Sequence, residues 1–70
     1  MELMLSNLVE AKRQIQSTIH KLKETVKTLE VKENPNRYKS QITLAQRRIE
    51  AFEISVFLIE REISNLSENS

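Results

Sequence analysis

The sequence predicts an all-α protein, an antiparallel two-helix hairpin of the coiled-coil type that is open to completing a bundle with partner helices. Apolar residues recur at alternating steps of four and three over most of the chain, which is the pattern of helices packed lengthwise. The 70 residues include no glycine and one proline, and 30% of them are charged. This composition is typical of long helices rather than of a turn-rich sheet.

Length and composition limit the function classes. We expect a single helical-hairpin domain, 1–70, whose core stays modest unless a partner helps. There is no cysteine, which excludes disulfides and thiolate metal sites and fits a reducing cytosol. The net charge is +1, and no apolar run approaches the ~18 residues of a membrane span or has the features of a signal peptide. The expected location is cytoplasmic.

The second helix, expected at about 35–66, carries the clearest pattern. Strong helix formers such as Leu44, Arg47 and Glu50 lie along it, and no glycine interrupts it. Its apolar residues at coiled-coil spacing form a seam that should face the first helix. These seam residues are Tyr38, Ile42, Ala45, Ile49, Phe52, Val56, Ile59, Ile63 and Leu66.

The first helix is expected at about 2–32. Its start is open, because Met1 and Leu5 extend the seam to the N-terminus whereas Asn7 followed by Glu10 is a variant of the capping box. We expect a start near Glu2 with fraying before Asn7. Lys12 occupies a seam position. Either its stem packs while the ammonium reaches Glu53 or Glu60, or it sets the register or the oligomeric state. The seam of this helix comprises Leu5, Leu8, Ile15, Ile19, Leu22, Val26 and Leu29.

The connection between the helices is expected at about 33–34. Asn34 is a good N-cap, and Pro35 fits the first helical position, where its missing N–H costs nothing. A residue before proline also avoids the helical region, which helps to stop the first helix. Because the connection is short, the helices must fold back antiparallel.

A second apolar stripe lies on the far side of the second helix. A helix that is apolar on more than one face needs more than one neighbour, so this stripe predicts association with a further helical surface. Phe57 lies beside the stripe, and we expect it either to anchor an intermolecular contact or to remain an exposed ring. The predicted partner-binding residues are Leu44, Ala51, Ile54, Phe57 and Leu58.

Charge is divided along the chain. From Lys12 to Arg48 the sequence contains ten Lys or Arg residues and three Glu residues. Beyond Arg48 it contains five Glu residues and one basic residue, Arg61. The basic turn end keeps open an alternative function, a homodimeric four-helix-bundle regulator that binds nucleic acid. Two observations argue against this alternative. Tyr38, the aromatic residue near the turn, is expected to pack in the seam rather than stack on a base, and no recognition-helix pattern is present. The basic residues near the turn are Lys27, Lys32, Arg37, Lys39, Arg47 and Arg48.

No catalytic, cofactor-binding or metal-binding constellation is evident. His20 falls on the outer face of the first helix without a partner, so a solvated surface role is expected. Glu60 and Glu62 do not share a helical face, and no histidine is near enough to complete a metal site with them. There is no glycine to build a phosphate-binding loop. We therefore expect a protein without enzymatic activity or cofactor.

The turn and second helix resemble the small hairpin co-chaperones of the type III secretion needle subunit, the YscE/PscE/SsaE family. The residues that carry the resemblance are Asn34-Pro35-Asn36-Arg37-Tyr38, Gln46-Arg47, Ala51-Phe52-Glu53, Leu58-Ile59 and Leu66. This sequence departs from the family pattern at the turn, because it lacks the glycines that some members carry there. The resemblance implies a cytoplasmic virulence-associated protein that pairs with a larger helical-repeat chaperone. Together the two would keep the needle subunit monomeric before export. It also remains open whether the chain forms a homodimer when it is alone.

Overall fold

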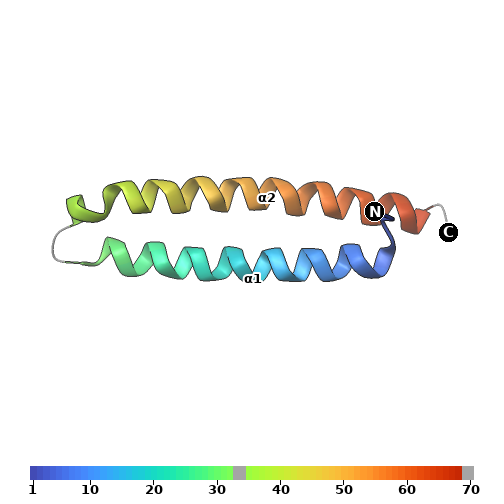
Figure 1. The fold of residues 1–70 in the computed structure, drawn as a ribbon, viewed down its shortest axis with the longest axis horizontal. Coiled ribbons are helices and arrows are strands. Elements are labelled where there is room, and N and C mark those ends of the chain that lie inside the picture. Colours follow the sequence, from blue (N-terminus) through green and yellow to red (C-terminus); the bar gives the residue numbers. More distant parts are fainter. Residues whose placement is uncertain (33–34, 69–70) are drawn as a thin grey trace.

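The computed structural model describes residues 1–32 and 35–68, which form an antiparallel pair of helices. α1 spans Leu5–Glu30, and α2 spans Lys39–Glu68. A single 3₁₀ segment, η1, covers Pro35–Tyr38 ahead of α2. Figure 1 shows the helices side by side, with η1 at one end and both termini at the other. The molecule is a rod of 54 × 20 × 14 Å, and the predicted all-α hairpin is confirmed.

The first helix begins at Leu5 rather than near Glu2, and Asn7 is its third residue and not its N-cap. The Asn7 Oδ1 accepts a hydrogen bond from the Met4 N–H at 2.9 Å, and the Asn7 Nδ2 donates to the Glu2 carbonyl at 2.9 Å. Met4 has extended backbone angles and is the N-cap. The predicted Asn7–Glu10 capping box is therefore wrong, since Glu10 accepts hydrogen bonds from Arg13 and Gln14 instead.

The other helix ends also differ from the expected bounds. α1 ends at Glu30 rather than near 32, and α2 continues to Glu68 rather than ending at 66. Residues expected to open the second α-helix form η1, and such 3₁₀ turns are frequent at helix N-termini. The expected turn at 33–34, with Asn34 as an N-cap, lies outside the described residues.

The core is a single seam between the two helices. Its buried residues are only 6–9% exposed, but no described side chain falls below 2%. Two packed helices cover each other along one line only, so the rest of each helix surface remains exposed to solvent. The buried residues are Leu8, Ile19, Val26, Ala45, Ile49 and Val56.

The structure places the predicted seam residues at this interface, with one exception. From Leu8 to Leu29 on α1 and from Tyr38 to Leu66, every apolar residue of the predicted seam is buried or half-buried. Leu5 was expected to extend the seam, yet it is 46% exposed. It lies in the first turn of α1, at the end of the rod opposite η1.

Candidate interaction surface on α2

An apolar surface that faces away from α1 runs along the outside of α2. We call it the outer stripe, and it consists of Leu44, Ala51, Ile54, Phe57 and Leu58. All of these residues are exposed. Phe57 is 65% exposed, although its neighbour Val56 is buried at 8%. The one-residue step turns the side chain by about 100° around the helix, which takes it out of the seam. The outer stripe is therefore a face of the rod that the hairpin itself leaves uncovered.

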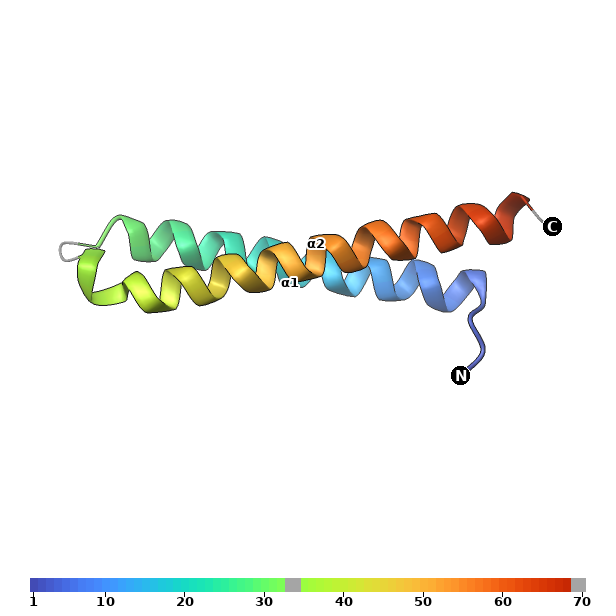
Figure 2. The same cartoon turned by 90° about the horizontal axis from the view of Figure 1, so that it is seen from above.

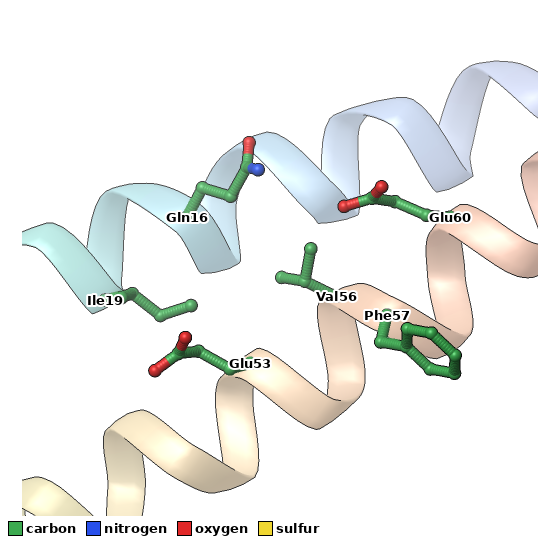
Figure 3. A pocket seen from close by; sticks show the side chains of 6 residues that line it. All are labelled: Gln16, Ile19, Glu53, Val56, Phe57 and Glu60. Atoms are coloured by element: carbon green, nitrogen blue, oxygen red, sulfur yellow. The ribbon is translucent and has the colours of Figure 1, made fainter.

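Phe57 lies between two shallow grooves. One groove, of about 350 Å³, lies between the helices, and Figure 3 shows Val56 directed toward α1 while the Phe57 ring is directed away from it. A second groove, of about 380 Å³, runs along α2 beside Ile54. Phe57 and Glu53 line both. The other lining residues are Gln16, Ile19, Val56 and Glu60 in the first groove and Gln46, Ile49, Glu50 and Ile54 in the second.

Leu58 lines a different groove, together with the N-terminal segment. Figure 2 shows residues 1–4 leaving the end of α1 sideways, off the line of the helix pair. The two Asn7 hydrogen bonds hold this segment in place. As a result Leu3 and Leu58 line one groove of about 350 Å³, whose other walls are Leu8, Ile59, Arg61 and Glu62. Leu3 therefore extends the apolar surface around Leu58.

Leu44 lies apart from the rest of the outer stripe, closer to the turn. It lines a groove of about 410 Å³ with two cationic residues, Lys39 and Arg47, and with Ser40 and Thr43. Leu44, Ile54, Phe57 and Leu58 therefore line several shallow grooves along α2. Ala51 is exposed and lies between Leu44 and Ile54 in the sequence.

One cross-helix ion pair lies beside the Phe57 groove. Lys12 Nζ of α1 is 3.9 Å from Glu60 Oε1 of α2, and the Lys12 side chain is 34% exposed. Of the two carboxylates expected for Lys12, the structure therefore selects Glu60. Figure 3 shows Glu60 and Glu53 on either side of Val56, so the groove has an apolar floor and acidic edges.

Further electrostatic contacts lie elsewhere on the rod. On α1, hydrogen bonds from Arg13 and then from Gln14 hold the pKa of the Glu10 carboxyl below its usual value. Near the turn, the Arg37 guanidinium lies 5.8 Å from the centre of the Tyr38 ring, and Tyr38 is half-buried. One face of the aromatic ring in the basic region is thus already engaged by a cation.

The sequence did not point to the polar walls of these grooves or to the groove that Leu3 shares with Leu58. Gln16, Gln46 and Glu50 line grooves although no apolar periodicity marks them. Gln16 and Gln46 occupy coiled-coil positions that flank the seam, and this was the available signal for them, because residues there border the interface. The path of residues 1–4 depends on the side-chain hydrogen bonds of Asn7.

Comparison of the chain with models of protein families, with curated proteins and with solved structures found no match. Within residues 1–32 and 35–68, no group of His, Cys, Asp and Glu side chains is arranged to hold a metal ion. In the same part of the chain, neither helix combines the length and the apolar character needed to cross a membrane.

Proposed function

We propose that this protein is a non-enzymatic adaptor that binds a larger helical protein through the outer stripe of α2. In the specific form that the sequence resemblance implies, it is a cytoplasmic co-chaperone of a type III secretion system. It pairs with a helical-repeat chaperone and, through that chaperone, helps to keep the needle subunit monomeric before export.

The observation that carries the proposal is the amount of surface that the hairpin leaves uncovered. The chain exposes 5752 Å², whereas a compact monomer of 8.2 kDa exposes about 4,500 Å². The excess, roughly 1,200 Å², is larger than the ~800 Å² that each partner buries in a standard protein interface. The outer stripe supplies large apolar side chains on that surface. Docking against the helices of another protein would bury these side chains and so stabilise both partners.

The mechanism follows from the burial of apolar area. Each Å² removed from water contributes about 25 cal/mol before the costs of association are subtracted. Phe57 is the natural anchor, because exposed aromatic rings bordered by grooves insert into pockets of a partner. The acidic edges made by Glu53 and Glu60 favour a partner with basic residues beside its apolar surface.

Reconstitution with the candidate helical-repeat chaperone and needle subunit of one secretion system tests the proposal. We expect the three proteins to co-elute and the needle subunit to remain monomeric. The double variant Phe57→Asp, Leu58→Asp should lose the complex and release the needle subunit into polymers, while its far-UV circular dichroism stays helical. A control variant, His20→Asp, introduces one negative charge at an exposed position of α1. A needle subunit that stays monomeric without this chain would contradict the proposal.

The nucleic-acid alternative rests on the exposed basic residues near the turn, such as Lys32, Lys39 and Arg47. It has less support, because Tyr38 is half-buried and contacts Arg37 instead of offering a free stacking platform. Affinity for RNA or DNA that falls steeply with salt concentration would favour it. No binding at low salt would remove it.

A further inference from the structure

We infer that in the absence of its partner the outer stripe is occupied by a second copy of this chain, with the two α2 helices packed antiparallel around Ala51. The inference rests on the proposed function in one respect: the second copy covers the same face as the larger partner and must leave before that partner binds.

The spacing of residues in the outer stripe suits an antiparallel pairing of two α2 helices. Leu44 and Leu58 each lie seven residues, two helical turns, from Ala51. When a second α2 runs in the opposite direction, Leu44 of one copy meets Leu58 of the other at both ends of the contact. Ala51 then faces its own equivalent at the centre, where its small side chain lets the helices approach closely. Such a contact is isologous, as a two-fold dimer requires.

The charge along α2 selects the antiparallel arrangement. Residues 39–49 carry three cations, Lys39, Arg47 and Arg48, and no acid, whereas residues 50–68 carry five Glu residues against Arg61. A parallel pair would place like charges side by side. Reversal brings the basic part of each helix beside the acidic part of the other, and it also sets the two helix dipoles in opposition.

The shape of the rod permits this contact. The turn and the termini lie at opposite ends of the rod in Figure 1, so a reversed copy places its turn beside the open end of the first. The outer stripe is exposed along its length and stays available to the second copy. The exposed area in excess of a compact monomer, roughly 1,200 Å², is more than the ~800 Å² that one side of a standard dimer interface buries.

Cysteine cross-linking tests the orientation directly, because the natural chain has no cysteine. We expect Leu44→Cys and Leu58→Cys chains to form little covalent dimer when each is oxidised alone and to cross-link efficiently when they are mixed. Disulfides require Cα atoms about 4.4–6.8 Å apart, so the pairing reports the register. His20→Cys serves as the control on the outer face of α1. Self-cross-linking of each variant alone, without the mixed product, would overturn the antiparallel arrangement.

Light scattering with size exclusion tests the dimer without any substitution. The mass should rise from 8.2 kDa toward twice that value as concentration increases, and Ala51→Glu should stay at 8.2 kDa while remaining helical. A wild-type chain of 8.2 kDa at every concentration would overturn the inference. This failure is distinct from a failure of the proposed function, since a monomer can still bind the larger chaperone and a dimer can form without any affinity for it.

Discussion

Lys12 of α1 reaches across the helix interface to Glu60 of α2, with Nζ 3.9 Å from Oε1. The pair joins a seam position to the edge of the groove beside Phe57. Lys12 interrupts an otherwise apolar seam, so the hairpin tolerates a cation there only because the ammonium reaches solvent and a carboxylate. Glu60 therefore takes part both in the contact between the two helices and in the edge of the groove beside Phe57.

Reversing the charge of Lys12 should destabilise the hairpin through repulsion. We expect Lys12→Glu to lower the free energy of unfolding by about 1 kcal/mol, the upper range for partly exposed pairs. The double variant Lys12→Glu, Glu60→Lys should recover part of that loss. Urea denaturation followed by circular dichroism, at one fixed protein concentration, measures both. A double variant that is less stable than Lys12→Glu alone would show that the two groups do not interact.

The stability of the hairpin should respond very differently to the same substitution at two neighbouring residues of α2. Val56→Asp buries an unpaired carboxylate in the seam and should cost about 3 kcal/mol or more, which unfolds a hairpin of marginal stability. Phe57→Asp alters an exposed position and should change the free energy of unfolding by no more than about 0.5 kcal/mol. Thermal unfolding of the two variants compares them. Loss of helicity in Phe57→Asp would place this ring in the hairpin's own core.

Asn7 should fix both the start of α1 and the path of residues 1–4. Asn7→Ala removes its hydrogen bonds to the Met4 N–H and the Glu2 carbonyl and should lower stability by about 1 kcal/mol. Amide exchange at Met4 should speed up correspondingly. Asn7→Asp retains the acceptor and adds a charge that the helix N-terminus favours, so it should be milder. Unchanged exchange at Met4 in Asn7→Ala would remove the capping role.

The lowered pKa of Glu10 gives one pH dependence with a defined sign. Because the folded-state pKa lies below the unfolded value, the contribution is present above the unfolded pKa and is lost as pH falls through the folded pKa. Arg13→Gln should raise the Glu10 pKa, since the Arg13 hydrogen bond is the largest cause of the shift. Carboxyl carbon chemical shifts followed through acid pH measure it. An unaltered titration of Glu10 would contradict the observed contact.

The hairpin and its seam could be predicted because one physical pattern determines both. Alternating steps of four and three place residues such as Ile19, Ile49 and Val56 along one line of a helix, and burial of that line follows. The exposure of Phe57 and Leu58 followed from the same geometry, since residues outside the seam of a two-helix rod have nothing to cover them.

The start of α1 and the division of the outer stripe into grooves could not be predicted in the same way. An Asn side chain can accept a hydrogen bond as an N-cap or, as Asn7 does, from within the first turn, and sequence spacing does not separate the two. The groove shared by Leu3 and Leu58 depends on that choice, because it sets the direction of residues 1–4. Local hydrogen bonds, rather than periodicity, decide these features.

The most direct test of the central claim is a binding titration of the chain against the candidate helical-repeat chaperone by calorimetry. The account predicts that Leu58→Asp weakens binding at least tenfold, about 1.4 kcal/mol or more, while helicity is retained. His20→Asp should bind as the natural chain does. Equal affinity of the helical Leu58→Asp variant and the natural chain would contradict the claim that the outer stripe of α2 is the docking surface.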